Sequence, residues 1–344
     1  MKYKSLGNTG LYVSELTLGT MTFSEGGGSY ADVLGATGQE LATRMVDLAI
    51  EAGINIFDTA NVYSAGESET LLGKALGARR KDAVIATKLY GTEGTGPNDL
   101  GTSRLAIMRE VEASLTRLGT DYIDLYQVHS FDPTTPLEET LRAMDDLVRQ
   151  GKVRYIGLSN FSAWQIAKAD GVAKLMGTEK FCSVQSYYSL VGRALEREII
   201  PAAMDLGLGT LIWSPLAGGF LSGKFTREGQ EKSARRANIP FPPIDMDKGY
   251  DVVDVLAKIA ANNEVSVAQV ALAWLLHKPG VTSVIVGARK ESQLVDNLGA
   301  TNVALSDDEI AQLDAVSALE PEYPNYMPKA DRGDDLMGRL RNDA

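Results

Sequence analysis

The chain is poor in the residues from which disulfides and zinc sites are built. Cys182 is its one cysteine, and His129 and His277 are its two histidines. A single cysteine excludes an intrachain disulfide, and a zinc site of the cysteine and histidine type needs more ligands than these. We therefore expect no structural metal, and nothing in the sequence points to a catalytic metal ion.

Long apolar runs and excess positive charge are also absent. The sequence has no 18 consecutive apolar residues and no apolar segment of signal-peptide type near its N-terminus, which favours a cytoplasmic protein. Asp and Glu number 45 against 34 Lys and Arg, a net charge of -11. Such a surface repels the phosphates of nucleic acids and of anionic membranes, so we expect neither as a partner. An anionic ligand must then be held by a local basic cluster.

What the chain does contain is an alternation of short apolar runs and amphipathic stretches. Hydrophobic residues make up 44% of the sequence, which is ample for a core. Eight strand-like runs alternating with helical patterns predict an α/β fold, a (β/α)8 TIM barrel formed by residues 1–344 as one domain. An open doubly wound sheet would usually carry a G-x-G-x-x-G turn after its first strand, and that motif is missing. The predicted strands are Leu16–Thr20, Asn55–Ala60, Ala83–Lys88, Ile123–His129, Arg154–Asn160, Cys182–Tyr188, Gly209–Pro215 and Thr282–Ala288.

Three further segments complete the expected architecture. "YKSLGNTGLYVS" is typical of a β-hairpin with Asn8 and Gly10 in its turn, and we expect it to cap the bottom of the barrel. Two long loops, 90–103 and Pro215–Tyr250, follow predicted strands, so they would lie over the opposite end. From about residue 320 the sequence indicates a loosely packed tail.

The ends of three successive predicted strands carry polar residues that form a chemical set. Asp58, Lys88 and His129 end the second, third and fourth strands, and Tyr63 follows Asp58 in the next loop. In a TIM barrel the strand ends form the reactive face. A lysine ammonium held by an aspartate favours the phenolate of a neighbouring tyrosine, which makes that tyrosine a usable proton donor near neutral pH. A neutral histidine could then donate a hydrogen bond to a carbonyl oxygen.

Each of these four residues also has a structural interpretation. Asp58 could cap a turn, Lys88 could be a solvated strand end, Tyr63 could be a loop aromatic, and a lone histidine such as His129 is more often a satisfied core residue. Their joint occurrence at consecutive strand ends favours the functional interpretation.

The motifs around these residues resemble those of the aldo-keto reductase superfamily, most closely its aryl-alcohol dehydrogenase-like branch. The resemblance runs from about Lys2 to Asp314. It implies a catalytic tetrad of Asp58, Tyr63, Lys88 and His129, and an NADP(H) cofactor bound without a Rossmann fold. The matching segments are "FDTANVYSAGESE", "ATK", "IDLYQVH", "GKVRYIGLSNFS", "VQSYYSL", "LIWSPLAGGFLSGKF" and "VIVGARKESQLVDNL".

The same resemblance implies a set of cofactor-binding residues. Ser159, Asn160 and Gln185 would bind the nicotinamide carboxamide, and Trp213 would stack on its ring. Arg289 and Lys290, at the start of the last barrel helix, would hold an adenosine 2′-phosphate and so favour NADPH over NADH. Gly287, just before them, would also contact the cofactor. Many family members have Lys-Ser in place of Gly287-Ala288, and Arg in place of Gln293. The remaining implied contacts are Ser214, Leu216, Gly218 and Lys224 at the pyrophosphate, with Gln293 and Asn297 at the adenine.

The expected activity is NADPH-dependent, reversible reduction of an aldehyde or ketone, with Tyr63 as general acid. Phe23, Tyr90 and Phe131, with Trp213, are expected to wall the substrate pocket, which suggests a bulky or aromatic carbonyl. One alternative is a barrel enzyme that forms a Schiff base at Lys88. Another is a regulatory subunit that binds the cofactor without turnover. The sequence leaves open the substrate and the physiological direction, and a monomer is the default.

Overall fold

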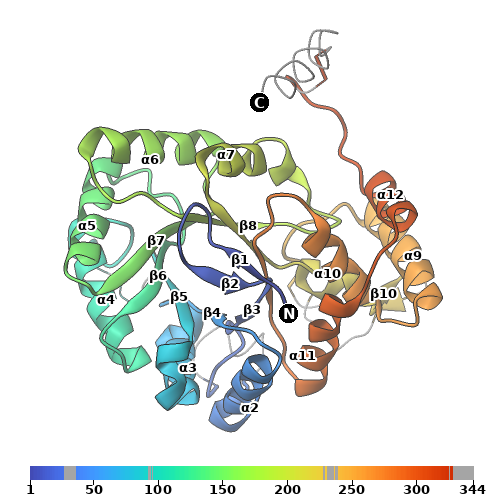
Figure 1. The fold of residues 1–344 in the computed structure, drawn as a ribbon, viewed down its shortest axis with the longest axis horizontal. Helices are drawn as coiled ribbons and strands as arrows, with labels where there is room; N and C mark the ends of the chain where they lie inside the picture. The colour runs from blue at the N-terminus through green and yellow to red at the C-terminus, as the bar shows by residue number, and fades with distance from the viewer. Residues whose placement is uncertain are drawn as a thin grey trace.

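Eight parallel strands close into a barrel at the centre of the molecule, in the order β12-β3-β4-β5-β6-β7-β8-β9 (Figure 1). This computed structural model describes residues 1–26, 36–91, 94, 96–227, 229–230, 236, 239–324 and 326–327. Every predicted strand overlaps one barrel strand, so the TIM-barrel prediction is confirmed. The strands are β3 (Leu16–Gly19), β4 (Ile56–Asp58), β5 (Val84–Leu89), β6 (Ile123–Val128), β7 (Val153–Ser159), β8 (Ser183–Tyr187), β9 (Gly209–Trp213) and β12 (Ser283–Val286).

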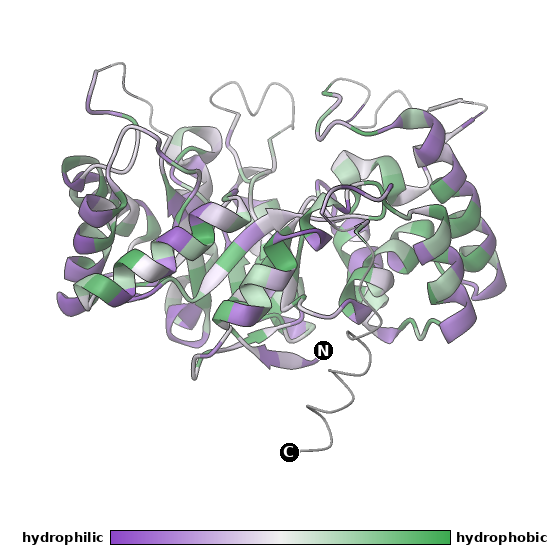
Figure 2. Cartoon of the chain, turned by 90° about the horizontal axis from the view of Figure 1, so that it is seen from above, coloured by the Kyte–Doolittle hydropathy of each residue, from purple (hydrophilic) through white to green (hydrophobic). Residues whose placement is uncertain are grey.

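Helices surround the barrel, with hydrophilic residues on the outer edges of the ring in Figure 2. Sequence signals set several helix ends: the Ser103 hydroxyl accepts from Ala106 N at the start of α4, and Gly119 ends that helix in the left-handed conformation. The helices of the ring are α2 (Gly38–Glu51), α3 (Glu67–Leu76), α4 (Arg104–Leu118), α5 (Leu137–Arg149), α6 (Ala163–Met176), α7 (Ile199–Leu206), α9 (Met246–Asn262), α10 (Val267–His277), α11 (Glu291–Leu298) and α12 (Asp307–Val316).

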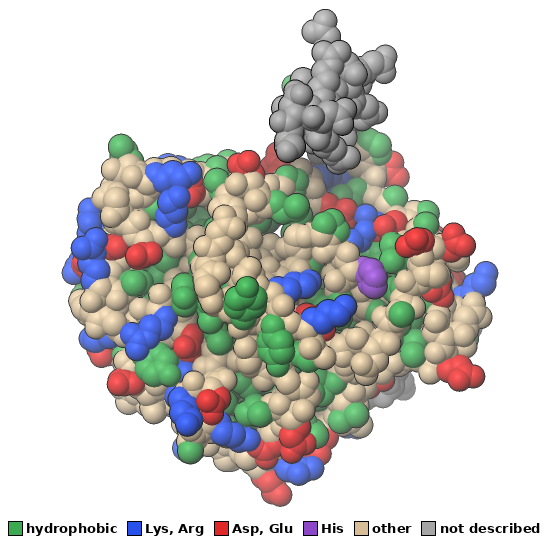
Figure 3. Space-filling view, viewed as in Figure 1, with side chains coloured by type: hydrophobic (Ala, Val, Ile, Leu, Met, Phe, Trp, Pro, Cys, Tyr) green, Lys and Arg blue, Asp and Glu red, His purple; other side chains and the backbone are tan. Residues whose placement is uncertain are grey.

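The N-terminal hairpin closes one end of the barrel, as predicted. Strands β1 (Tyr3–Ser5) and β2 (Tyr12–Ser14) pair antiparallel and lie across the centre of the barrel in Figure 1. Leu6 and Val13 are fully buried in a cluster with residues of the barrel interior. Asn8 N donates to Gly207 O at 2.8 Å, which fastens the turn to the loop before β9. Charged side chains of both signs surround this face (Figure 3). The hairpin therefore leaves the opposite end of the barrel for a ligand.

The two long loops have different relations to that open end. The first begins beside the Tyr63 loop, where Asn61 Nδ2 donates to Gly91 O at 2.6 Å. The second contains the 3-10 helix η4 (Ala217–Ser222). It also contains a short antiparallel pair of strands, β10 (Phe225–Thr226) and β11 (Gly229–Gln230). Parts of both loops lie outside the described residues.

The C-terminal segment is tied to the barrel as far as it is described. Arg197 contacts Glu322 at 3.1 Å and donates to Glu320 O. Most of the predicted loose tail, 328–344, lies outside the described residues. Within the described ranges no single helix has the length and apolar character to cross a membrane, and α9 and α10 reach that threshold only as a pair bent by 99°. Cytoplasmic location stays a prediction.

Candidate active site

A cavity of about 580 Å³ lies where the barrel strands end. Parallel strands bring their carboxyl ends to one face, so residues far apart in the chain meet there. Most of the predicted site residues line this cavity: Asp58, Tyr63, His129, Ser159, Asn160, Gln185, Trp213, Ser214, Leu216, Gly218, Lys224, Gly287, Arg289, Gln293 and Asn297.

Asp58, Lys88 and Tyr63 form a connected chain at the floor of the cavity. Lys88 Nζ lies 2.5 Å from Asp58 Oδ1 and 2.8 Å from Thr59 O. The same Nζ lies 3.5 Å from Tyr63 Oη and 5.0 Å from the centre of the Tyr63 ring. The Lys88 side chain is completely buried, and it is the lysine that connects the acid to the tyrosine.

The charges of this cluster follow from burial and from the neighbouring groups. Burial alone would lower the pKa of Lys88, but the Asp58 carboxylate and the Tyr63 oxygen outweigh it and leave that pKa above its ordinary value. Burial, aided by the charge of Lys88, lowers the pKa of His129 to about 3. The histidine is therefore neutral at physiological pH. Its ring meets the Tyr63 ring edge to face, with 5.9 Å between centroids.

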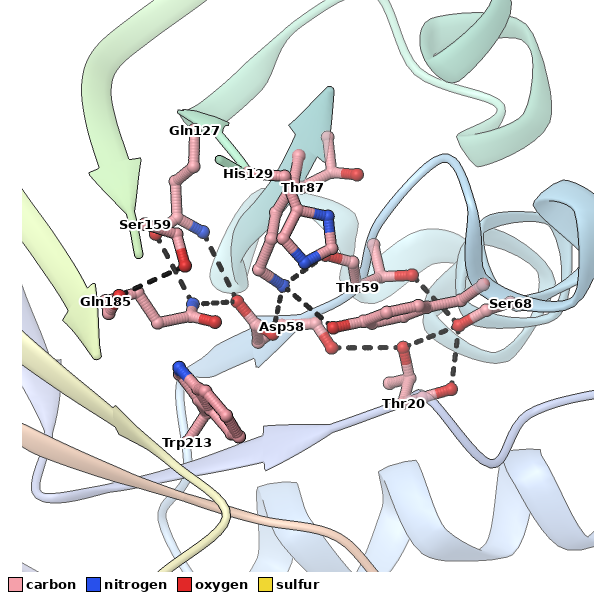
Figure 4. A network of polar contacts seen from close by, with 12 residues as sticks. Thr20, Asp58, Thr59, Ser68, Thr87, Gln127, His129, Ser159, Gln185 and Trp213 are labelled. Carbon is pink, nitrogen blue, oxygen red and sulfur yellow. Dashed lines mark hydrogen bonds and ion pairs between the residues drawn. The ribbon is translucent and has the colours of Figure 1, made fainter. Parts of the chain in front are cut away.

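The second oxygen of Asp58 is held by two glutamine amides. Gln185 Nε2 donates to Asp58 Oδ2 at 2.7 Å, and Gln127 Nε2 donates to the same oxygen at 3.3 Å. Figure 4 shows both glutamines on one side of Asp58, with Thr59, Thr20 and Ser68 on the other. Gln185 was predicted as a cofactor contact, whereas Gln127 was not predicted at all. Its one signal was its place two residues before His129, on the same face of the strand.

The turn after Tyr63 has an unusual backbone. Ser64, Ala65 and Gly66 have φ values of 46°, 56° and 83°, a run of left-handed residues that costs energy at the two non-glycine positions. A Cβ atom on Gly66 would lie 2.5 Å from Cδ of Arg117. Arg117 Nε is held at 2.6 Å by the fully buried carboxylate of Glu69. Packing from α3 and α4 therefore stabilises the turn that presents Tyr63.

Trp213 and Asn160 form the wall beside the floor. Trp213 Nε1 donates to Asn160 Oδ1 at 3.0 Å, and Asn160 Nδ2 donates to His129 O at 2.9 Å. Ser159 Oγ donates to Gln185 O at 3.0 Å. The Trp213 ring lies nearly parallel to that of Phe241, at 9° and 5.9 Å between centroids. Hydrogen bonds therefore connect the predicted stacking ring, Trp213, to Asn160, one of the residues predicted to bind the carboxamide. Both lie in the same wall of the cavity.

The other end of the cavity combines positive charge with open glycines. Lys224 and Arg289 line it, and Gln293 Oε1 accepts from Arg289 N at 2.9 Å, which shapes the loop before α11. Added Cβ atoms on Gly219 and Gly287 would meet nothing within 3.7 Å, so both leave space on the cavity side. Lys290 is exposed and does not line the cavity. Its predicted phosphate contact stays a prediction.

The three predicted substrate residues lie away from this cavity. Phe23 is fully buried in the hydrophobic cluster between strands and helices, so it is a core residue and not a wall of the cavity. Phe23 follows β3 after a short turn, and its apolar ring is more stable in that cluster than in a cavity open to water. Tyr90 is partly buried outside the lining residues, and Phe131 packs against Phe161 and Trp164. A substrate role for Tyr90 and Phe131 stays a prediction.

Several lining residues were missed by reasoning from the sequence. Met21 and Thr22 follow β3 directly, and Asp296 lies one turn of α11 after Gln293, so the strand-end rule and helical spacing could have found them. Ile239 and Phe241 come from the long loop after β9. Nothing in the sequence of that loop indicates which of its residues return to the cavity.

The described residues contain no group of three or more His, Cys, Asp or Glu side chains that could hold a metal ion. The cavity does bring together a buried acid, an ammonium, a phenol and a neutral imidazole.

Comparison with known proteins agrees with this geometry. The Aldo/keto reductase family model matches residues 15–318. An uncharacterized oxidoreductase, YrpG, of Bacillus subtilis is 41% identical over 91% of this chain and 94% of its own length. A probable voltage-gated potassium channel subunit beta of Oryza sativa is 39% identical, over 94% and 98%. Versiconal hemiacetal acetate reductase of Aspergillus parasiticus is 35% identical, over 96% and 98%. The chain belongs to the aldo/keto reductase family of oxidoreductases.

Proposed function

We propose that the protein reduces an aldehyde or ketone to an alcohol with NADPH, and catalyses the reverse oxidation. One observation carries this proposal: hydrogen bonds connect Asp58, Lys88 and Tyr63 at the cavity floor, and neutral His129 lies beside them. It contains a proton donor, a charge that stabilises the donor after it loses its proton, and a neutral hydrogen-bond donor for a carbonyl oxygen.

Each protein group has a defined part in the reaction. Tyr63 Oη transfers its proton to the carbonyl oxygen as that oxygen gains negative charge. The Lys88 ammonium, 3.5 Å away, stabilises the phenolate that remains. Asp58 holds the ammonium in place. His129 donates to the same carbonyl oxygen and orients it, which it can do because it is neutral. In the reverse direction the Tyr63 phenolate accepts the proton of the alcohol.

NADPH fits the groups that line the rest of the cavity. When bound, it supplies the hydride that the carbonyl carbon accepts. Trp213 offers an aromatic ring, Gln185 and Ser159 offer polar groups for the carboxamide, and Gly219 and Gly287 leave room for close backbone approach. Lys224 and Arg289 provide the local positive charge that an acidic protein needs to hold phosphates. Arg289 is the residue we assign to the 2′-phosphate.

The Schiff-base alternative is disfavoured by the state of Lys88. A nucleophilic amine must be neutral and accessible, whereas Lys88 is fully buried, paired with Asp58 and held protonated by a raised pKa. The regulatory alternative is supported by a relative. The probable potassium channel subunit beta of Oryza sativa matches this chain over nearly its full length. This alternative predicts that the cavity binds the cofactor without turnover.

The test is consumption of NADPH, against NADH, over a panel of aromatic, aliphatic and sugar-derived carbonyls. We expect turnover that prefers NADPH and that falls at least about a thousandfold in Tyr63→Phe, because that variant binds ligands but has no proton to give. Tyr155→Phe is the matched control, since Tyr155 packs in the cluster at the hairpin end of the barrel. Its activity should stay within about twofold of the wild type.

The outcomes separate the alternatives. Tight NADPH binding with no turnover on any carbonyl would favour the regulatory function. Full activity in Tyr63→Phe would exclude Tyr63 as the acid. A permanent adduct at Lys88 after borohydride treatment with a carbonyl would support the Schiff-base mechanism.

A further inference from the structure

Gln127 is a buried polar residue beneath the cavity that the proposed reaction does not yet use. It lies in β6, where its Cα is the register partner of Lys88 in β5 and of Gly157 in β7. The side chain is fully buried and does not line the cavity. Burial of an amide inside a barrel is costly unless its donors and acceptor are satisfied, so its partners define what it does.

The space for this amide comes from the neighbouring strand. A Cβ atom on Gly157 would lie 3.1 Å from Gln127 Cγ and 2.5 Å from Ser183 Oγ. Gly157 therefore leaves the gap through which the Gln127 side chain extends across β7 toward β8. The barrel interior is built to accommodate a long side chain at this position.

The hydrogen bonds of the two glutamines form a triangle with Asp58. Gln127 Nε2 and Gln185 Nε2 both donate to Asp58 Oδ2, at 3.3 and 2.7 Å. Gln185 Nε2 also donates to Gln127 Oε1 at 3.4 Å. Because a carboxylate only accepts, turning over either amide would set an oxygen against the oxygen of Asp58. The triangle consequently allows one orientation of each amide.

This orientation determines what Gln185 presents to the cavity. Its Nε2 is committed to Asp58 and Gln127, so the group left for a ligand is the carbonyl oxygen Oε1, an acceptor. Gln185 lines the cavity while Gln127 lies behind it. The primary carboxamide of a nicotinamide carries an N–H donor that matches this acceptor.

We propose that Gln127 is a positioning residue, which orients Gln185 so that its Oε1 accepts from the nicotinamide carboxamide while its Nε2 holds Asp58. This inference rests on the proposed function, since it requires a nicotinamide cofactor. Through the triangle, the position of the cofactor and the position of the Asp58 and Lys88 pair depend on one buried amide. Gln127 acts through these residues and touches neither substrate nor cofactor.

The first test compares two ligands by their quenching of tryptophan fluorescence. One is NADP⁺, and the other is its 3-acetylpyridine analogue, in which a methyl group replaces the carboxamide NH₂. In the wild type we expect the analogue to bind about fivefold more weakly, the effect of one neutral hydrogen bond. In Gln127→Met, whose side chain has nearly the same length, the two dissociation constants should differ by less than about twofold.

A second variant tests the effect of Gln127 on the charges at Asp58. Its readout is the pH profile of kcat, which would not change if Gln127 only filled space. Gln127→Glu sets a second carboxyl group beside Asp58, and the Asp58 carboxylate raises the pKa of this new group. Once both carboxyls are ionised at alkaline pH, the added negative charge favours the protonated forms of Lys88 and Tyr63. We expect the alkaline limb of the kcat profile to move up by roughly one pH unit. In a Gln185→Met background, Gln127→Met should add little further loss of NADP⁺ affinity, because the two residues act as a unit.

The control is Thr17→Val, which removes a buried hydroxyl that pairs with Ser283 at 2.6 Å elsewhere between the barrel strands. It should lower thermal stability without altering ligand discrimination or the pH profile. The proposal is overturned if Gln127→Met keeps the wild-type ratio of dissociation constants, or if Gln127→Glu leaves the profile in place. Failure of the wild type to bind NADP⁺ would instead overturn the proposed function, so the two failures are distinguishable.

Discussion

Lys88 Nζ lies 2.5 Å from Asp58 Oδ1 inside the barrel, where the two side chains are 0% and 4% exposed. The strands β4 and β5 pair in parallel, with Asp58 in register with Ala86, so that Lys88 lies two residues further along its own strand and on the same face. The pair is therefore built into the barrel interior, and its energetics follow those of a buried ion pair.

We expect Lys88→Met to destabilise the fold by about 3 to 5 kcal/mol, because it leaves the Asp58 carboxylate buried without its charged partner. Activity should be lost as well. Urea denaturation at pH 7 measures the first effect, and the Asp58→Asn, Lys88→Met double variant should lose less than the sum of the single losses. Arg44→Met, at the exposed pair of Arg44 with Glu291, should leave stability nearly unchanged, because solvent screens that pair. Additive losses in the double variant would contradict the coupling.

His129 makes stability depend on pH. Its pKa in the folded protein is about 3, lowered from 6.5 by burial and by Lys88. Between these values the unfolded chain binds a proton that the folded chain does not, so stability is fully present above pH 6.5 and falls as the pH drops toward 3. The slope should be about 1.4 kcal/mol per pH unit for this one group. His129→Gln should flatten the curve of unfolding free energy between pH 6 and 4, and an unchanged slope would exclude His129 as its source.

The turn after Tyr63 should be sensitive to a single methyl group. Gly66→Ala adds a Cβ atom 2.5 Å from Arg117 Cδ at a φ of 83°, so we expect a loss of about 2 kcal/mol. The kcat should fall roughly tenfold as Tyr63 shifts. The matched variant is Gly77→Ala, which also has positive φ, at 50°, but has open space around its Cβ position. It should lose some stability and retain kcat, and equal kcat losses in the two variants would argue against the specific contact.

Arg289 should set the preference for NADPH over NADH. It is on the cavity lining, whereas Lys290 is exposed and outside that lining. We expect Arg289→Met to weaken NADPH binding by roughly tenfold to a hundredfold while changing NADH binding little, since only NADPH carries the 2′-phosphate. Lys290→Met should have a smaller effect. Isothermal titration with both cofactors measures this, and an equal loss for NADPH and NADH would remove Arg289 from the phosphate site.

Much of the barrel could be predicted because it follows from local patterns. The period of the apolar residues distinguishes strands from helices, and the strict alternation of the two leaves few folds other than a closed parallel barrel. Once the barrel is inferred, the residues that end its strands are known to share one face. That is why Asp58, Lys88 and His129 could be grouped from the sequence.

The sequence by itself thus determined the fold class, the end of the barrel that carries the site, and the residue types that meet there. Only the tertiary structure decided which side chains reach the cavity: Phe23 turned into the core, Lys290 faces outward, and Phe241 returns from a long loop. It also decided that Gln127 joins Gln185 at Asp58. Contacts of this kind depend on register between strands and on the gap at Gly157, and no local pattern encodes either one.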